Sequence, residues 1–529
     1  MSERGTGMTD EREPGSLPEV DERILDSFEH AEAAAAAYQA LLERAGEQAV
    51  EPRIEATRRA VELLGDPQRL YRVIHITGTN GKGSTARIAD GLLRAHGLRT
   101  GVLTSPHLER VNERILIDGE PVSDEAFARN YEDVAPFLDL VDAELAQHGE
   151  RRLTFFEAFT VLAFAVMADA PVDVAVLEVG MGGTWDSTNV ADGDVAVITP
   201  IALDHMSRLG STVEAIAGEK AGIIKPDAIV VSAAQEPSVV EVLEARAEEV
   251  GARLLLDGRD FSLTAQSVAV GGQLITVQGL AAEYIDQLVP LMGAHQGRNA
   301  ALAMVAVEAF LGGGAQPMTA EVLADGLAVA TSPGRLDLIG TEPLVIADAA
   351  HNPHGAAALR AALGEYFGLE RVTLVLGVLV GKDATGVLTE LEPVIDELIV
   401  TQSTSERALD ADELAGAAVE VLGADRVVVE PDLATAVETA RDAAADRGGA
   451  VVVTGSITLL GDVIAHARET GWLQRPDVRR QTATVQLDAP ELEAEQHEAA
   501  QLEAEQLAVE QPGREQAREQ GREQLGGER

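Results

Sequence analysis

The sequence contains no cysteine, which excludes disulfides, thiolate metal sites and a cysteine nucleophile. Aromatic residues make up only 3% of the chain, so a core must be built mainly from Ala, Val, Leu and Ile. Such a composition suits helices packed on a buried parallel sheet. At 529 residues with a hydrophobic fraction of 46%, the chain is expected to form a soluble protein of two domains.

Long apolar runs and a balanced charge are also missing. The N-terminus, MSERGTGMTDEREPGS, is polar, and apolar stretches such as residues 159–168 are too short to span a bilayer. The formal net charge of -47 argues against nucleic-acid binding, because phosphates would be repelled. We therefore expect a cytoplasmic protein with no membrane or nucleic-acid partner.

Lysine is almost absent: its only positions are Lys82, Lys220, Lys225 and Lys382, and Arg supplies the remaining strongly basic side chains. A drift in the base composition of the genome would explain this preference for arginine without any role in function. A chain biased in this way should nevertheless keep lysine where a guanidinium cannot serve. A compact ammonium against a phosphate and an amine that reacts covalently are two such places.

Strand and helix patterns alternate along the chain, which predicts parallel sheets covered by helices. Helical patterns cover residues 21–64 and 84–96, and residues 250–290 are β-rich and irregular. The fold class is therefore α/β, with an N-terminal, doubly wound, mainly parallel sheet and a smaller C-terminal Rossmann-like domain. Buried strands are expected at residues 71–77, 102–104, 174–179, 195–199 and 229–232, and in a second series at 344–347, 372–377, 397–401, 426–429 and 450–454.

Composition sets the expected boundaries. Residues 1–20 are predicted to be disordered, and residues 476–529 to be a Gln- and Glu-rich tail that is disordered or a solvated helix. Between them, a first α/β domain is expected at 21–330 and a second α/β domain at 331–475. A hinge is expected near 326–336.

The strongest local signal is a glycine-rich segment between a predicted strand and a predicted helix. Glycines allow backbone N–H groups to surround phosphate oxygens, while the helix N-terminus and a lysine add positive charge. A plain turn is the alternative. The standard phosphate-loop motif is not matched, because Ile76 stands where its first glycine belongs. The predicted ATP-binding residues here are Thr79, Asn80, Gly81, Lys82, Gly83, Ser84 and Thr85.

The spacing G-T-N-G-K-G-S-T, from Gly78 to Thr85, is that of the Mur ligase superfamily. Within it, residues 53–462 resemble the dihydrofolate synthase/folylpolyglutamate synthase family through several motifs in the same order. The resemblance implies an ATP-dependent acid–amino-acid ligase that forms an acyl phosphate. Its substrates would be L-glutamate, dihydropteroate and (tetrahydro)folates. The alternative is folylpolyglutamate synthesis alone.

Three motifs imply magnesium ligands. Ser105 lies in S-P-H-L, Glu178 in L-E-V-G-M-G-G, and His205 in D-H-x-x-x-L-G. A carboxylate at a strand end is a hard oxygen ligand that suits magnesium. A turn residue and a structural histidine are the alternatives for Ser105 and His205. The resemblance implies two magnesium sites, and potassium is a further candidate.

Lys220 lies in E-K-A-G-I-I-K-P, where the family carries a carbamylated lysine. Only an amine can form a carbamate, which agrees with the retention of lysine; a simple ion pair is the alternative. The implied catalytic residues are Lys82, carbamylated Lys220, His205 and His351.

In the second half, the motifs H-Q-x-x-N, P-G-R and D-G-A-H-N-P imply further nucleotide contacts. Asn299, Arg335 and Asp348 are expected at ATP, and His351 near the incoming glutamate. A guanidinium suits the charge that builds up during phosphoryl transfer. Ala349 replaces the usual glycine.

Two motifs imply the pterin and folate site, T-F-F-E and G-G-T-W-D-S-T-N. A carboxylate such as that of Asp186 accepts paired hydrogen bonds from a pterin. Thr184 stands where arginine is commoner, which leaves open whether dihydropteroate is a substrate in addition to folates. Instead of binding the pterin, Phe155 and Phe156 could pack in the hydrophobic core. The implied residues are Thr154, Phe155, Phe156, Glu157, Trp185, Asp186 and Ser187.

Two other classes compete with this interpretation. A cell-wall Mur ligase usually carries a domain for its UDP-linked substrate before the phosphate loop, and here a helical segment precedes it. A nucleotide-dependent switch would use the loop, but it has no need for Glu178, His205 and Lys220. We expect a monomer whose partners are small molecules.

Overall fold

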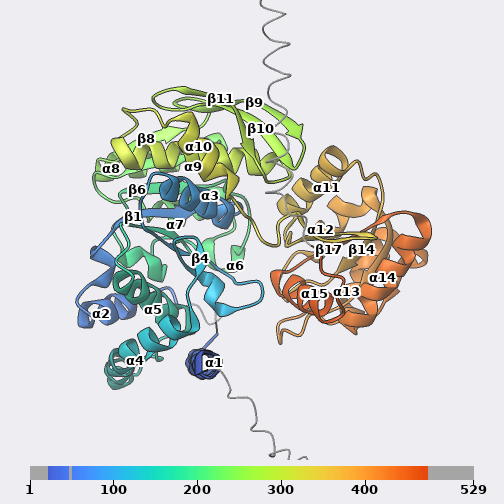
Figure 1. Ribbon diagram of the computed structural model, residues 1–529, viewed down its shortest axis with the longest axis horizontal. Helices are drawn as coiled ribbons and strands as arrows, with labels where there is room; N and C mark the ends of the chain where they lie inside the picture. The colour runs from blue at the N-terminus through green and yellow to red at the C-terminus, as the bar shows by residue number, and fades with distance from the viewer. Residues whose placement is uncertain (1–21, 47–50, 475–529) are drawn as a thin grey trace, which may run out of the picture.

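The computed structural model describes residues 22–46 and 51–474. The predicted disordered N-terminus (1–20) and the acidic tail (476–529) lie outside the described residues. Within the described residues the chain forms two α/β domains side by side, shown at left and right in Figure 1.

The N-terminal domain is organised around a sheet with the strand order β4-β3-β2-β5-β1-β6-β7-β8. Six neighbouring strands of this sheet, β2, β5, β1, β6, β7 and β8, run parallel to one another. The strands β3 and β4 add an antiparallel edge beside β2. This confirms the mainly parallel, doubly wound prediction. The bounds are β1 (Arg72–Thr77), β2 (Thr100–Leu103), β3 (Ile115–Ile117), β4 (Glu120–Pro121), β5 (Val174–Glu178), β6 (Val195–Ile198), β7 (Ile229–Ser232) and β8 (Arg253–Leu256).

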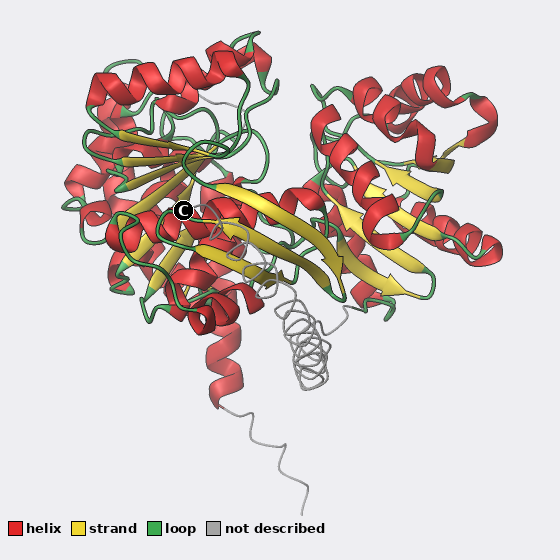
Figure 2. Ribbon diagram, turned by 90° about the horizontal axis from the view of Figure 1, so that it is seen from above, coloured by secondary structure: helices red, strands yellow, loops and turns green. Residues whose placement is uncertain are grey.

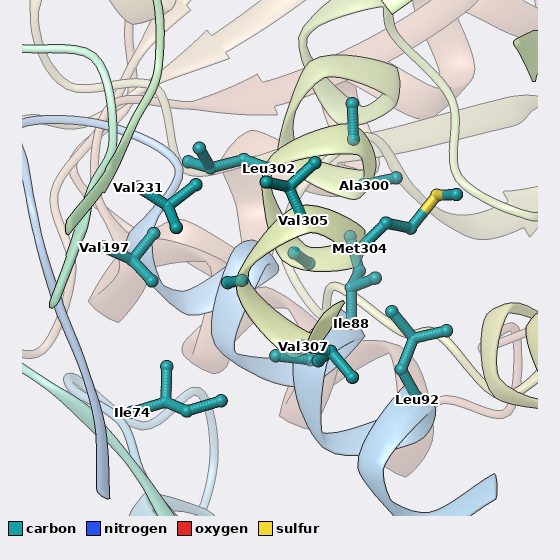
Figure 3. Packing of buried hydrophobic residues seen from close by; sticks show 14 of the residues in the cluster. Ile74, Ile88, Leu92, Val197, Val231, Ala300, Leu302, Met304, Val305 and Val307 are labelled. Carbon is teal, nitrogen blue, oxygen red and sulfur yellow. The ribbon is translucent and has the colours of Figure 1, made fainter. Parts of the chain in front are cut away.

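Helices cover both faces of this sheet, because successive strand side chains point to opposite faces. On one face, Ile88 of α3 and Val305 of α9 pack near Val197 of β6 (Figure 3). Ala196 and Ile198 point to the opposite face. The first face carries α3 (Lys82–Ala95), α9 (Ala294–Gly312) and α10 (Ala320–Ala328); the second carries α1 (Glu22–Leu42), α2 (Glu55–Leu63), α4 (Asp124–Gln147), α5 (Phe155–Asp169), α7 (Val213–Ala221) and α8 (Pro237–Val250).

Two regions differ in detail from expectation. The predicted helical stretch 21–64 is two helices, α1 and α2, which are separated by a segment containing the helix breakers Gly46 and Pro52. The irregular β-rich region contains an antiparallel sheet of β9 (Ser262–Ala269), β10 (Gly272–Gln278) and β11 (Glu283–Val289) that packs beside α9 and α10.

The C-terminal domain has a sheet in the order β12-β13-β17-β14-β15-β16, in which only β12 is antiparallel. This confirms the smaller Rossmann-like domain, which lies at the right in Figure 2. The strands are β12 (Asp337–Thr341), β13 (Leu344–Asp348), β14 (Val372–Leu376), β15 (Ile395–Val400), β16 (Val427–Val429) and β17 (Ala450–Thr454). The helices are α11 (Pro353–Phe367), α12 (Ala384–Leu391) and α13 (Ala411–Leu422) on one face, and α14 (Leu433–Arg447) and α15 (Ile457–Glu469) on the other.

The carboxyl ends of the parallel strands meet at one edge of each sheet, where ligands usually bind in such folds. The phosphate loop follows β1, Glu178 ends β5 and Asp348 ends β13. One short helix, α6 (Met206–Leu209), follows β6 at this edge. The described residues also contain short 3-10 helices: η1 (Pro67–Arg69), η2 (Val111–Arg114), η3 (Ser187–Val190), η4 (Glu392–Val394) and η5 (Ala424–Arg426).

Candidate active site

A cleft of about 1710 Å³ is lined by residues of both domains. Almost every side chain that the sequence singled out contributes to its wall. The residues brought together are Thr79, Asn80, Gly81, Lys82, Gly83, Ser84, Ser105, Thr154, Phe156, Glu157, Glu178, Trp185, Asp186, Ser187, His205, Lys220, Asn299, Arg335, Asp348 and His351. Thr85 and Phe155 are not part of the wall.

The phosphate loop is built on positive backbone φ angles, at Gly78 (+147°) and Gly81 (+89°). A Cβ at Gly78 would lie 1.8 Å from Oγ1 of Thr199, and one at Gly81 would lie 2.5 Å from Oδ1 of Asn299. Both positions therefore require glycine, as the motif predicted.

Lys82 folds back over this loop. Its Nζ donates to the carbonyl oxygens of Gly78 (3.3 Å) and Thr79 (3.2 Å), which keeps the ammonium beside the N-terminus of α3. The Ser84 hydroxyl lines the cleft and lies 2.8 Å from that of Ser332 in the segment joining the domains. Thr85 differs from expectation: its buried hydroxyl donates to the Gly81 carbonyl at 2.8 Å, so it supports the loop from behind.

Glu178 and Ser105 are in direct contact. The Ser105 N–H donates to Oε2 of Glu178 at 3.2 Å, and this is the one direct hydrogen bond to that carboxylate among the described residues. Burial raises the pKa of Glu178, against the opposing effect of the Lys82 charge. A buried carboxylate with so few donors favours a neighbouring cation, and the Ser105 hydroxyl adds a second oxygen. The pair fits the predicted magnesium site.

His205 belongs to a second group. His205 is 40% exposed, and its partial burial together with the Lys382 charge lowers its pKa to about 4, so its ring is neutral near pH 7 and has a lone pair for a metal. No direct contact joins His205 to Glu178 within residues 22–46 and 51–474, and no three acidic or histidine side chains converge there into one metal-binding group. The Lys82 charge acts on both Glu178 and His205, so both side chains lie within electrostatic reach of its ammonium.

Lys220 lies on α7 and is only 4% exposed. Its Nζ is 2.6 Å from the carbonyl oxygen of Gly78 in the phosphate loop. Burial and the neighbouring charge of Lys82 lower the pKa of Lys220 to about 7. A substantial fraction of this amine is therefore unprotonated near neutral pH, the form that reacts with carbon dioxide.

Asp204 connects the two domains, a role that its motif did not reveal. Its carboxylate lies 3.0 Å from Nζ of Lys382, 3.4 Å from Nδ2 of Asn352 and 3.7 Å from Nε2 of His351. Burial alone would raise the pKa of Asp204, but the nearby His351 side chain and the charges of His205 and Lys382 lower it. Lys382 is the one lysine outside the sequence motifs, and its retention was the available signal.

Two of the second-half residues predicted to contact ATP, Arg335 and Asp348, lie together at the P-G-R turn. Asp348 accepts hydrogen bonds from the N–H groups of Leu336 and Ala350, both at 2.9 Å, and burial raises its pKa. It therefore holds the turn that carries Arg335. Ala349 donates its N–H to the Gly334 carbonyl at 2.9 Å, so this backbone accommodates alanine without losing the contact.

Asn299 reaches the phosphate loop from α9. It is buried, its Nδ2 donates to Oε1 of Gln296 at 3.0 Å, and its side chain packs against Gly81. On the other side of the cleft, His351 Nδ1 lies 3.0 Å from the Ala349 carbonyl, which turns Nε2 towards Asp204.

The residues predicted to bind the pterin have mixed roles. Thr154 and Glu157 form a capping box at the start of α5, and Glu157 is also paired with Arg53 at 2.9 Å. Phe156 and Trp185 line the cleft. Phe155 was expected there, but it is buried and stacks on Phe159 with ring centroids 5.7 Å apart, which is its alternative core role.

Asp186 also lines the cleft, but its oxygens are already used within the chain. Oδ2 accepts from the Met181 N–H and Oδ1 from the Thr188 N–H, both at 2.9 Å, and Oδ1 accepts from the Thr188 hydroxyl at 2.5 Å. Burial raises the pKa of Asp186. This carboxylate therefore shapes the turn formed by residues 181–188. In the same turn, the Ser187 hydroxyl accepts a hydrogen bond from the Thr57 hydroxyl at 3.1 Å.

Comparisons with known proteins agree with this geometry. The family model "Mur ligase middle domain" matches residues 76–307, and "Mur ligase, glutamate ligase domain" matches residues 334–457. The fold and cleft are thus those of a Mur ligase. Dihydrofolate synthase/folylpolyglutamate synthase from Mycobacterium tuberculosis is 45% identical over 434 residues, which are 78% of this chain and 89% of that protein. The chain belongs to the dihydrofolate synthase/folylpolyglutamate synthase family.

Two further relatives are similar. Folylpolyglutamate synthase from Lacticaseibacillus casei is 39% identical, over 63% of this chain and 78% of its own length. The solved structure of Mycobacterium tuberculosis folylpolyglutamate synthase complexed with ADP and AMPPCP has a TM-score of 0.79 and 41% identity. It covers 84% of this chain and all of that one. Among the described residues, no helix has both the length and the apolar character needed to cross a membrane.

Proposed function

We propose that this protein ligates L-glutamate to dihydropteroate and to the γ-carboxylate of (tetrahydro)folates, with ATP converted to ADP and phosphate. The observation that carries the proposal is one cleft between two domains that joins the phosphate loop and the Glu178–Ser105 pair to Arg335 and His351. The name of the Mycobacterium tuberculosis relative includes both activities.

ATP would bind along the phosphate loop, with its phosphates near Lys82 and its flank against Asn299. Arg335 of the P-G-R turn faces the same cleft and supplies a planar cation. The loop residues from Asn80 to Ser84 offer backbone N–H groups, Asp348 holds the turn, and Thr85 supports the loop from behind.

The reaction requires two transfers. An oxygen of the substrate carboxylate attacks the γ-phosphorus, the bond to the bridging oxygen breaks, and ADP leaves with an acyl phosphate remaining. The glutamate amine then attacks the acyl carbon, loses a proton, and the C–O bond to phosphate breaks to leave the amide. Lys82 and Arg335 neutralise charge on the transferring phosphoryl group, usually the largest catalytic contribution. His351 lies on the C-terminal side, where the glutamate would enter.

Glu178 and Ser105 would hold one magnesium ion, and His205 with carbamylated Lys220 would hold a second. When bound, these ions supply charge neutralisation to the phosphates. Carbamylation joins the unprotonated Nζ of Lys220 to carbon dioxide with loss of a proton, converting a buried cation into an anion. A potassium ion remains a further candidate at the anionic edge of the cleft.

The folate arm would lie against Phe156 and Trp185, which line the cleft. Thr154, Glu157, Asp186 and Ser187 build the walls that position these rings. Folylpolyglutamate synthesis alone is the second candidate, because Thr184 stands at the usual arginine position.

The substrates named here belong to the cytoplasm, where we place the enzyme, and we expect a monomer. We also place the domain boundary in the segment 329–336 that connects α10 to β12.

The test is to incubate the purified protein with ATP, magnesium and glutamate, with dihydropteroate or tetrahydrofolate, and to measure products by mass. Glutamate added to both substrates supports the bifunctional proposal. Addition to tetrahydrofolate alone selects the second candidate, and no addition to either overturns both. Hydroxylamine in place of glutamate should yield a hydroxamate, and its absence would contradict the acyl phosphate.

A further inference from the structure

Arg87 is a cationic side chain in the cleft wall that the mechanism leaves unused. It lies on α3, four residues after Gly83, so both occupy the same face of the helix. Gly83 faces the Glu178 carboxylate, since a Cβ there would lie 3.2 Å from Oε2. Arg87 is therefore one helical turn further along the wall that carries Glu178, and it lines the cleft.

Two of the three carboxylates around Arg87 are already engaged. Electrostatically, its guanidinium interacts with Glu113, Glu178 and Asp90. Glu113 accepts the backbone N–H groups of residues 108–110 at 2.8 to 3.1 Å. Asp90 accepts from Arg94 at 2.9 Å and from the Thr100 hydroxyl at 2.5 Å. Among the described residues, none forms a direct hydrogen bond or ion pair with the Arg87 side chain.

Other arginines beside this part of the cleft have partners. Arg53 is bound to Glu157 at 2.9 Å, and Arg114 donates to Nδ1 of His107 at 2.8 Å. Burial lowers the pKa of Arg87, although such a group stays charged. A largely buried guanidinium with unused donors is costly unless an anion completes its hydrogen bonds.

The two proposed acceptors, dihydropteroate and folate, differ by one carboxylate next to the reacting group. Dihydropteroate has a single carboxylate, the one that reacts. A folate monoglutamate has a reacting γ-carboxylate and, in addition, an α-carboxylate that takes no part in bond formation. Where the cleft excludes water, a fixed cation stabilises that second carboxylate, and a guanidinium can bind it through two parallel hydrogen bonds.

We propose that Arg87 binds the α-carboxylate of the glutamate already attached to a folate substrate, and so selects glutamylated acceptors. The inference rests on the proposed function and deepens it. Arg87 would contribute little to reaction with dihydropteroate. It would contribute strongly to every round of chain extension, because each such acceptor carries an α-carboxylate beside the reacting group.

The experiment compares wild type with Arg87→Met and Arg87→Lys, using dihydropteroate, tetrahydrofolate and the α-amide of tetrahydrofolate. In Arg87→Met, kcat/KM for tetrahydrofolate should fall about 10- to 100-fold. The fall for dihydropteroate should stay within about threefold, and Arg87→Lys should restore part of the loss. Wild type should prefer the α-carboxylate to the α-amide, and Arg87→Met should treat them alike.

An equal loss with all three acceptors would overturn the proposal, because Arg87 would then act on the shared reacting carboxylate or on Glu178. An unchanged preference for the α-carboxylate in Arg87→Met would also overturn it. Arg129→Met, an exposed change on α4, is the control and should behave as wild type. Calorimetric binding of tetrahydrofolate and its α-amide to the ADP-loaded protein tests the same preference without turnover, so failure of the proposed ligase activity would be seen separately.

Discussion

Nζ of Lys382, in the C-terminal domain, lies 3.0 Å from Oδ1 of Asp204, in the N-terminal domain. Both side chains are mostly buried, with exposures of 15% and 13%. The pair therefore joins the two walls of the cleft at the point where His205 and His351 also approach. Opening the cleft must separate these charges.

We predict that Asp204→Asn and Lys382→Met are energetically coupled. Because the pair is buried, a double-mutant cycle on unfolding should give a coupling energy of about 1–3 kcal/mol. The matched control is the exposed pair Arg447–Glu397 within the C-terminal domain, which should give about 0–1 kcal/mol. Additive effects of the two buried changes would contradict a joining role.

The same carboxylate predicts a pH dependence. Since the pKa of Asp204 is lowered in the folded protein, its contribution to the free energy of unfolding should be complete above about pH 4 and be lost at lower pH.

Lys220→Arg should abolish turnover, with kcat falling at least about 100-fold, because arginine cannot form a carbamate. The measurement is initial rate together with a carbon-13 NMR signal from labelled bicarbonate. Because the pKa of Lys220 is about 7, the unprotonated amine and hence bicarbonate-dependent activation should decline as the pH falls below 7. Lys225→Arg is the control for the same exchange. Wild-type activity in Lys220→Arg would remove the carbamate from the mechanism.

Glu178→Gln should stabilise the metal-free protein while removing activity. Burial raises the pKa of Glu178, so its charge is unfavourable near neutral pH without a cation, and this penalty should fade as the pH falls through the raised pKa. In chelator, the variant should melt about 2 °C or more above wild type near pH 7. Magnesium should raise the melting temperature of wild type only. An equal magnesium effect on both proteins would place the ion elsewhere.

Phe155→Ala and Phe156→Ala should separate packing from binding. Loss of the buried Phe155 ring should cost about 3–5 kcal/mol in the free energy of unfolding. Phe156 lines the cleft, so its loss should chiefly raise KM for the pteridine substrate. Denaturant unfolding and steady-state kinetics on both variants measure this. A larger KM effect from Phe155→Ala would show that our correction of its role is wrong.

Gly78→Ala should distort the phosphate loop, because the new Cβ would meet Thr199 at 1.8 Å. We expect a loss of about 2 kcal/mol or more in unfolding free energy, with ATP binding weakened further. Gly97→Ala is the matched control, since its φ is +78° with no atom within 4 Å of the added Cβ. It should cost about 1 kcal/mol and leave ATP affinity unchanged. Equal effects of the two changes would show that steric contact is not the cause.

The main strands of both sheets were predictable because buried parallel strands are continuous apolar runs. The edge strands β3, β4 and β12 were not: two are very short, and antiparallel edges lack that pattern. The break between α1 and α2 was visible as Gly46 and Pro52, but the Ala-rich helical pattern around it concealed the signal.

At the site, residue identity was more predictable than orientation. Phe155 and Phe156 are neighbours in an α5 that is apolar on nearly every side, so periodicity could not decide which ring faces the cleft. The internal hydrogen bonds of Asp186 depend on how the turn after β5 closes, which no local pattern specifies. Arg87 carries no motif at all, and only its lack of partners in three dimensions distinguishes it.

The distribution of lysines has a practical consequence for anyone working with this protein. Three of the four, Lys82, Lys220 and Lys382, line the cleft. Lys82 and Lys220 both donate to the Gly78 carbonyl, and Lys382 pairs with Asp204. Amine-directed labelling followed by peptide mass analysis would thus report almost entirely on the cleft. Lys82 would respond to nucleotide, Lys220 to carbamylation, and Lys382 to the separation of the domains. Because arginine replaces lysine elsewhere in the chain, amine-reactive reagents would label side chains mainly in the cleft of the natural protein.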